Sequence, residues 1–380
     1  MKQIYLDYAA ATPLAPAVKE AMLPYLDEAF YNPSAQYLAA QNVAHEVEKA
    51  RASIAHWLGC RPIELTFTAG GTEANNLAIH GLMRCYPEGN MVFSAIEHEA
   101  VIEPAKRYPH TAVAVTDHGL IDLDALAGAI NNKTVLVSVM YANNEIGTVQ
   151  PLKKVAQLVR TERARRQKSG NNLPIYLHTD ACQAGAYLDL HVNRLGVDMM
   201  TINAGKIYGP KQCGALYVRS GIELEPQISG GGQERGRRSG TESVANIIGF
   251  ATALELVQNN RHHETERLQD LQAHFIKSLQ EHMPDVTVNG SLKHRLPNNI
   301  HITVPGTDNE RLMMQLDEQG VQCAVGSACS ASNDEPSHVL QALGLSEEAA
   351  QSSLRFTMGL GTTKADVDYT VRALMRSTKS

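Results

Sequence analysis

The sequence predicts an α/β protein, with a large domain built on a mostly parallel sheet covered by helices and a smaller α+β domain. Short apolar runs alternate with helical stretches through the first two-thirds of the chain, an order typical of a parallel sheet. After a long helical stretch over residues 244–282 this order changes, which indicates a second domain. We expect the large domain over residues 13–250 and the small domain from residues 1–12 and 251–380.

The elements of the large domain follow from the placement of apolar residues. Residues 134–140 are apolar almost throughout, as expected of a strand buried on both faces. Leu152, Val155 and Val159 share one face of a helix over 152–168, whose basic end, 163–168, is expected to be solvated. Further strands are expected at residues 63–68, 91–94, 112–115, 175–178, 198–202 and 214–218, and a further helix at 74–83.

The small domain is expected to hold a different mixture of elements. Its strands are predicted at residues 299–304 and 354–358, and its helices at 310–319, 337–343 and 364–377. Strands and helices that do not alternate regularly favour an α+β arrangement.

The composition is that of a globular protein that we expect in the cytoplasm. The chain has 380 residues, of which 43% are hydrophobic, enough to bury a sizeable core. Its net charge of -6 argues against a nucleic-acid or acidic-membrane surface. The six cysteines form no Cys-x-x-Cys pair, so neither a zinc site nor a disulfide framework is predicted. No signal segment is visible, and no run reaches the ~18 apolar residues of a membrane helix.

Two polar positions after expected strands suit a cofactor with an aldehyde. Lys206 lies in a glycine-containing loop, where a desolvated amine can form a Schiff base. Asp180 ends a strand, so its carboxylate is expected to face the ligand crevice, opposite a pyridine nitrogen. Gln183 is spaced to bond a phenolic oxygen. The alternatives are a surface Lys, and an Asp with a Gln that cap a helix.

Four more residues are expected along the same crevice. The turn that contains Gly71 and Thr72 opens a helix, and its N–H groups with the Thr hydroxyl predict an anion site. His98 follows the strand that ends at Ser94, where it can stack on a ring and move protons, although most of the 15 histidines are expected to be ordinary. Asn144 follows the strand at 134–140.

Two residues near the C-terminus favour sulfur chemistry on an amino acid. Cys329 lies in Gly-Ser-Ala-Cys-Ser, a run of small residues that suits a mobile nucleophile; the alternative is a small buried hydrophobe. Arg355 suits bidentate binding of a carboxylate. The loop 230–241, with three arginines, is either an anion-binding or a solvated segment.

Taken in order, these segments resemble the NifS/IscS group of cysteine desulfurases, in the class V family of fold-type I pyridoxal phosphate enzymes. The resemblance runs from Ile4 to Phe356, nearly the whole chain. Its motifs are specific jointly; they are 143–147, Asp180 with Gln183, 206–210, 235–241 and 326–330.

The resemblance implies a homodimeric cysteine desulfurase that uses pyridoxal 5'-phosphate. Lys206 would hold the cofactor and act as a base, and Cys329 would take sulfur from L-cysteine as a persulfide, releasing L-alanine. His98 would stack on the ring and belong to the catalytic set. Other cofactor contacts would come from Asp180, Gln183, Asn144, Gly71, Thr72, Asn203 and, in a neighbouring subunit's site, Thr241. Substrate contacts would come from Arg355, Asn144 and Asn32.

The resemblance also implies a partner and leaves alternatives open. The persulfide sulfur would pass to an acceptor protein, an iron–sulfur scaffold or a tRNA-thiolation enzyme. A selenocysteine lyase, an aminotransferase on the same fold and a non-catalytic scaffold are the alternatives. The chain departs from the family's usual pattern at Gly205, which replaces a His, and at Asn203, which replaces a Ser; both family residues contact the cofactor phosphate. The segment 32–37 also lacks the family's usual His.

Overall fold

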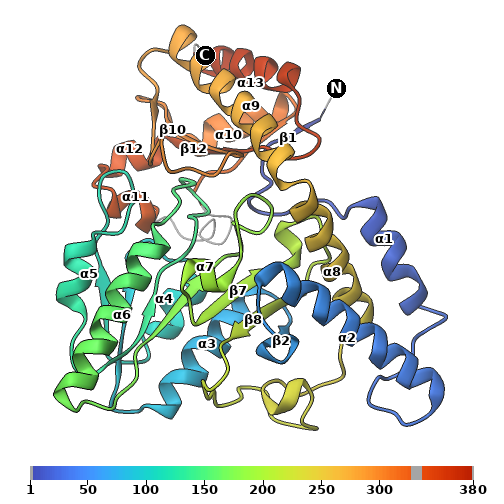
Figure 1. Ribbon diagram of the computed structural model, residues 1–380. Coiled ribbons are helices and arrows are strands. Elements are labelled where there is room, and N and C mark those ends of the chain that lie inside the picture. The colour runs from blue at the N-terminus through green and yellow to red at the C-terminus, as the bar shows by residue number, and fades with distance from the viewer. Residues whose placement is uncertain (1–2, 327–335, 379–380) are drawn as a thin grey trace.

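The computed structural model describes residues 3–326 and 336–378. Its larger part contains a seven-stranded sheet in the order β2-β8-β7-β6-β5-β3-β4 (Figure 1). All of these strands run in one direction except β8, which is antiparallel to both neighbours, so the predicted mostly parallel sheet is confirmed. The strands are β2 (Leu65–Thr68), β3 (Asn90–Ser94), β4 (His110–Val113), β5 (Thr134–Ser138), β6 (Tyr176–Asp180), β7 (Met199–Asn203) and β8 (Gly214–Val218).

Helices cover both faces of this sheet because successive strand residues point to opposite sides. Met199 of β7 packs in the core with Leu77, whereas its neighbour Met200 packs in the core that contains Val155. The first face is covered by α3 (Gly71–Cys85), beside α4 (Glu99–Ala105). The second face carries α6 (Leu152–Ser169), with α5 (Leu123–Ala129) and α7 (Val192–Leu195) beside it.

The first 60 residues form helices that the sequence analysis did not predict. They are α1 (Pro16–Met22), a short turn η1 (Leu23–Tyr25) and α2 (Leu38–Leu58), with η2 (Pro62–Glu64) leading into β2. Both α1 and α2 pack against α8 (Val244–Asn259). The signal was present in α2, since Val43, Val47, Ile54 and Leu58 recur at helical spacing on its buried face.

The smaller part is built from both ends of the chain. Its strand β1 (Ile4–Tyr5) pairs in parallel with β11 (Val321–Gln322), and β10 (Asn299–Thr303) lies between β9 (Thr287–Val288) and β12 (Ser353–Thr357). Its helices are α9 (Arg261–His282), α10 (Asn309–Glu318), α11 (His338–Ala342), α12 (Glu347–Gln351) and α13 (Lys364–Ser377). The domain limits at residues 12 and 250 stay a prediction.

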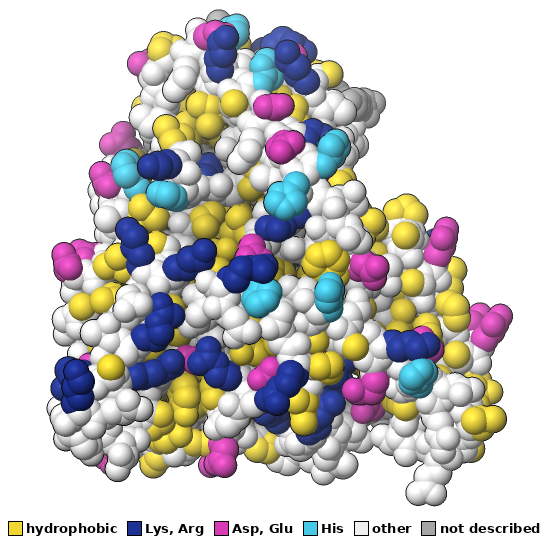
Figure 2. Space-filling model, viewed as in Figure 1, with side chains coloured by type: hydrophobic (Ala, Val, Ile, Leu, Met, Phe, Trp, Pro, Cys, Tyr) yellow, Lys and Arg dark blue, Asp and Glu magenta, His cyan; other side chains and the backbone are white. Residues whose placement is uncertain are grey.

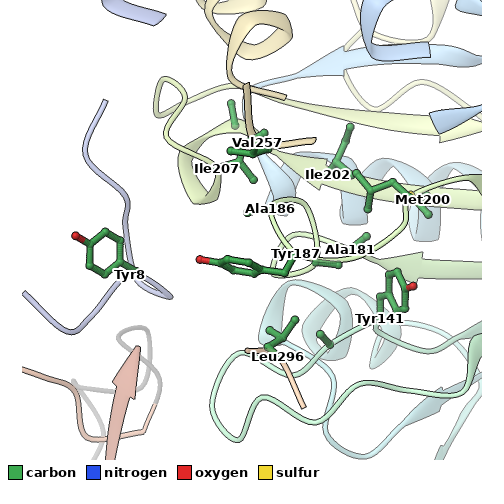
Figure 3. Packing of buried hydrophobic residues seen from close by; sticks show 14 of the residues in the cluster. Tyr8, Tyr141, Ala181, Ala186, Tyr187, Met200, Ile202, Ile207, Val257 and Leu296 are labelled. Atoms are coloured by element: carbon green, nitrogen blue, oxygen red, sulfur yellow. The ribbon is translucent and has the colours of Figure 1, made fainter. Parts of the chain in front are cut away.

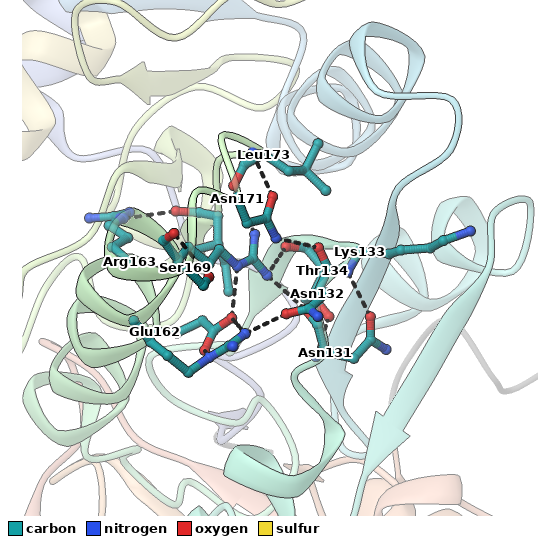
Figure 4. A network of polar contacts seen from close by, with 12 residues as sticks. Asn131, Asn132, Lys133, Thr134, Glu162, Arg163, Ser169, Asn171 and Leu173 are labelled. Atoms are coloured by element: carbon teal, nitrogen blue, oxygen red, sulfur yellow. Dashed lines mark hydrogen bonds and ion pairs between the residues drawn. The ribbon is translucent and has the colours of Figure 1, made fainter.

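Two sequence-based expectations were wrong in detail. The stretch 244–282 is two helices, because α8 ends and α9 begins on either side of Asn260. The basic end of α6 is not wholly solvated, since Arg166 is 2% exposed. Its guanidinium donates to Glu162 and to the carbonyls of Asn131 and Thr134, so it ties α6 to the start of β5; Figure 4 shows this network.

Buried aromatic side chains fill the space between the two parts. Tyr187, from the loop after β6, extends toward Tyr8 of the N-terminal segment, as Figure 3 shows. The ring of Tyr8 lies 6.1 Å from that of Tyr208. Among the residues that the structure describes, no helix combines the length and hydrophobicity of a bilayer span.

Candidate active site

One cavity lies where the carboxyl ends of the parallel strands meet the smaller part of the molecule. Its volume is about 230 Å³. Crevices at this end of an α/β sheet are the usual place for ligands. Its walls are formed by Ala9, Ala10, Gly71, Thr72, Asn75, His98, Ala100, Met140, Ala142, Asn144, Asp180, Cys182, Gln183, Asn203, Lys206 and Arg355.

Lys206 enters the cavity from a tight turn. The turn η3 (Ala204–Lys206) follows β7 directly and is capped by Asn203, whose Oδ1 accepts a hydrogen bond from Gly205 N–H at 2.8 Å. The Lys206 amine donates to the carbonyls of Ala9 at 2.8 Å and Ala10 at 2.6 Å. The N-terminal segment therefore holds the amine at the cavity wall.

Asp180 is held by two donors at the end of β6. Asn75 Nδ2 lies 2.6 Å from Asp180 Oδ2, and Cys182 N–H donates to Oδ1 at 2.9 Å. Gln183 follows in the same wall and donates to the carbonyl of Ala9 at 3.0 Å, rather than capping a helix.

The start of α3 forms a narrow part of the cavity. Gly70, before it, has φ 137°, which favours glycine. A Cβ on Gly71 would lie 2.7 Å from the Cys182 sulfur, so only glycine fits there without a shift. Burial and the neighbouring Asp180 raise the pKa of the Cys182 thiol well above its usual value. Thr72 follows Gly71 and also lines the cavity.

His98 stands at the N-terminus of α4. Its Nδ1 accepts a hydrogen bond from Ala100 N–H at 3.0 Å, which places any proton of the neutral ring on Nε2. The preceding residue, Glu97, is fully buried, and its Oε1 accepts a hydrogen bond from Met140 N–H at 2.6 Å. Burial raises the pKa of Glu97 well above its usual value.

Arg355 comes from β12, in the smaller part. It is 2% exposed, and its Nη2 lies 2.7 Å from Asp7 Oδ1. Its Nη1 donates to the carbonyl of Asn144 at 3.0 Å, so Arg355 and Asn144 meet at the cavity. A buried Arg held in this way presents a fixed set of donors for a carboxylate.

Two of the residues expected at the site, Asn32 and Thr241, lie away from the cavity, and a third, Cys329, is outside the described residues. Asn32 is exposed, accepts the N–H of Ser34 and does not line the cavity. Thr241 is also exposed and outside the cavity of its own chain. The roles predicted for these three residues stay predictions.

The sequence analysis did not predict four residues that contact the cavity's lining residues: Asn75, Asp7, Glu97 and Cys182. Asn75 had a signal, because it lies four residues after Gly71 and so on the same face of α3. Asp7 had none, since its partner is 348 positions away.

The whole chain is similar to known proteins of one kind. The model of the family described as aminotransferase class-V matches residues 4–370. The protein named cysteine desulfurase IscS of Dictyoglomus turgidum is 42% identical, over 99% of this chain and 94% of its own length. The chain belongs to the aminotransferase class-V family, among its cysteine desulfurases. The predicted resemblance to the NifS/IscS group is confirmed.

Solved structures of the same family confirm the fold. A NifS-like protein from Rickettsia africae is 30% identical with a TM-score of 0.88, and all of both chains is covered. A structure described as SspA in complex with cysteine is 34% identical with a TM-score of 0.81, covering 94% of this chain and 99% of that one. Desulfurases of this family depend on pyridoxal phosphate, so the cofactor predicted from the sequence is confirmed as well.

The residues around the cavity fit that cofactor. Asp180 offers a carboxylate to a pyridine nitrogen, and Lys206 offers an amine to an aldehyde. The N–H groups at the start of α3, the Thr72 hydroxyl and Asn203 offer neutral donors to a phosphate. The absence of a Cβ on Gly71 leaves this end of the cavity open.

Proposed function

We propose that this chain removes sulfur from L-cysteine, giving L-alanine and a persulfide on Cys329. One observation supports it above the others. Lys206 and Asp180, at the ends of two parallel strands, line the same cavity as Arg355 from the smaller part. An amine and an acid that suit the cofactor thus share one cavity with a buried Arg that suits an amino acid's carboxylate.

In this proposal the large part holds the cofactor. Lys206 would attach it, Asp180 would pair with its ring nitrogen and Gln183 with its phenolic oxygen, and His98 would stack on the ring. Thr72, Gly71 and Asn203 would bind its phosphate. When bound, the cofactor withdraws electrons from the substrate's Cα, which weakens the Cβ–S bond.

The substrate is oriented from the other wall. Arg355 binds the carboxylate of L-cysteine, and Asn144, whose backbone carbonyl accepts a hydrogen bond from Arg355, lines the same cavity. The amine of Lys206 would serve as the base that takes a proton from the substrate's Cα. His98 is placed at the same cavity to carry protons near neutral pH.

Sulfur then passes to the enzyme. The thiolate of Cys329 attacks the sulfur of the substrate, so an S–S bond forms and the Cβ–S bond breaks. The electron pair of the broken bond stays with the carbon product, which takes up a proton and leaves as alanine. The persulfide passes to an acceptor protein, an iron–sulfur scaffold or a tRNA-thiolation enzyme.

A homodimer is part of this proposal. Large apolar side chains are exposed together at the start of the chain, namely Leu23, Leu26, Phe30, Tyr37 and Leu38. Figure 2 shows apolar atoms gathered over this side of the molecule, near α1. Exposed apolar groups of this extent favour a protein interface. Thr241 would then reach the cofactor phosphate in the partner's cavity.

The test is to give L-cysteine to the purified holoenzyme and to count alanine and sulfur transferred to an acceptor thiol. We expect alanine and a shift of the visible absorption band. Lys206→Ala is expected to lose both, whereas Cys329→Ser keeps the band and loses transfer. Sulfur transfer by Cys329→Ser would overturn the mechanism. A keto acid product would indicate an aminotransferase. Turnover of selenocysteine but not of cysteine would indicate a selenocysteine lyase, and the absence of any turnover would indicate a non-catalytic scaffold.

A further inference from the structure

Thr12 lies outside the cavity but contacts the turn that carries Lys206. Its hydroxyl accepts a hydrogen bond from Tyr208 N–H at 2.7 Å and donates one to the Gly205 carbonyl at 3.1 Å. Its own N–H donates to the same carbonyl at 3.2 Å. Thr12 is 2% exposed, so these bonds form away from water. One hydroxyl thus joins the residue before Lys206 to the second residue after it.

The turn that Thr12 contacts is strained. Tyr208 has φ 64°, a left-handed conformation that residues with a side chain rarely adopt. Such a conformation persists only where the surroundings hold it. Here three hydrogen bonds hold Tyr208. The Thr12 hydroxyl accepts one from the Tyr208 N–H. Ala15 N–H donates to the Tyr208 carbonyl at 3.0 Å, and Leu360 N–H donates to the Tyr208 phenol oxygen at 2.9 Å. Two of these three hydrogen bonds therefore come from residues 12–15.

The same N-terminal segment also holds the side chain of Lys206. The amine donates to the carbonyls of Ala9 and Ala10, three and two residues before Thr12. The backbone on both sides of Lys206 and its amine are thus held by one stretch of chain. Such a stretch limits where the amine can lie relative to a ring bound on Asp180.

We infer that Thr12 is a positioning residue for Lys206. It touches neither cofactor nor substrate, since it does not line the cavity. Its hydroxyl links Gly205 to Tyr208 and so holds the strained turn in its conformation. The conformation of the turn then determines where the Lys206 amine lies in the cavity. This inference rests on the proposed function in one respect, that Lys206 carries the cofactor.

The test compares Thr12→Val, which keeps the shape and removes the hydroxyl, with Thr12→Ser, which keeps the hydroxyl. Pyridoxal phosphate is titrated into each cofactor-free protein, and the pH midpoint of the visible band is measured on each loaded protein. For Thr12→Val we expect about fivefold weaker cofactor binding, a midpoint moved by about half a pH unit, and about tenfold lower kcat with KM within about twofold. Thr12→Ser is expected to restore all of these values.

Thr370→Val is the matched control. The Thr370 hydroxyl is also buried and donates to a backbone carbonyl, that of Asp366 at 2.8 Å, but it lies within α13. If Thr12→Val loses stability like Thr370→Val but keeps the wild-type binding and midpoint, the inference is wrong. If Thr12→Val does not fold, Thr12→Ala replaces it with the same expectations. Cofactor binding and the pH midpoint of the visible band can be measured without turnover. They therefore still test the role of Thr12 if the wild type forms no alanine.

Discussion

Asp7 and Arg355 form an ion pair of 2.7 Å across 348 positions of sequence. The pairing of β1 with β11, and a parallel bridge between Asp7 and Thr357, carry the start of the chain beside β12. The first residues therefore supply the acid partner of the Arg that we propose to bind substrate. The same segment continues to Ala9, Ala10 and Thr12, which hold Lys206.

Removing the charge of Asp7 is expected to weaken substrate binding. Asp7→Asn leaves the buried Arg355 without its acid partner, so its donors are held less firmly. We expect KM for L-cysteine to rise about tenfold while kcat stays within about twofold. Steady-state kinetics measure both values. Asp189→Asn is the control, because it breaks an exposed pair with Arg194. A lower KM in Asp7→Asn would mean that Asp7 competes with the substrate's carboxylate.

A histidine at position 205 is expected to tighten cofactor binding. The family usually has His there, and a Cβ built on Gly205 meets no atom closer than 3.4 Å, so a side chain can begin without displacing its neighbours. An added donor to a charged phosphate is worth about 1.5–3 kcal/mol, so Gly205→His is expected to lower the dissociation constant about tenfold or more. Fluorescence titration of the cofactor-free protein measures it. Unchanged affinity would mean that the phosphate lies away from Gly205.

A methyl group at position 71 is expected to have the opposite effect. In Gly71→Ala the new Cβ would approach the Cys182 sulfur to 2.7 Å and push the start of α3 out of place. We expect cofactor affinity to fall about tenfold. Adding Cys182→Ala removes the clashing sulfur and is expected to restore most of the loss, as the same titration would detect. Failure of this rescue would place the cause in the backbone.

Two buried histidines are expected to make the fold sensitive to acid. Burial lowers the pKa of His178 to about 4 and that of His301 to about 3. The unfolded chain takes up these protons near pH 6.5, whereas the folded chain does not until the lower values. The free energy of unfolding is therefore expected to fall from pH 6.5 toward pH 4, by about 1.4 kcal/mol per pH unit for each His.

Urea unfolding at several pH values measures this slope. His301 is the better site to alter, since it lies in β10 and its Nε2 has no hydrogen-bond partner in the described part of the chain. His301→Gln is expected to flatten the pH dependence, whereas His110→Gln, at an exposed position, leaves it unchanged. Equal slopes in all three proteins would assign the acid sensitivity to other groups.

The chain order of elements and two polar residues of the cavity were predictable because they depend on local patterns. Apolar runs between turns predicted the strands, and polar residues directly after a parallel strand fall at one edge of the sheet. Asp180 and Lys206 could be found in this way, and both line the cavity. The break between α8 and α9 at Asn260 could not be predicted in this way. The burial of Arg166 could not be predicted either, because a helical pattern carries no information about what packs on the polar face of the helix.

By itself the sequence determined the α/β class, the family and the residue types for binding a cofactor, since each depends on nearby residues or on motifs. Only the tertiary structure decided which distant residues support them. Asp7 meets Arg355, Asn75 holds Asp180, and Thr12 spans Lys206 across a strained turn. Such contacts join segments that are brought together only when the sheet and the smaller part have packed, so no local pattern records them.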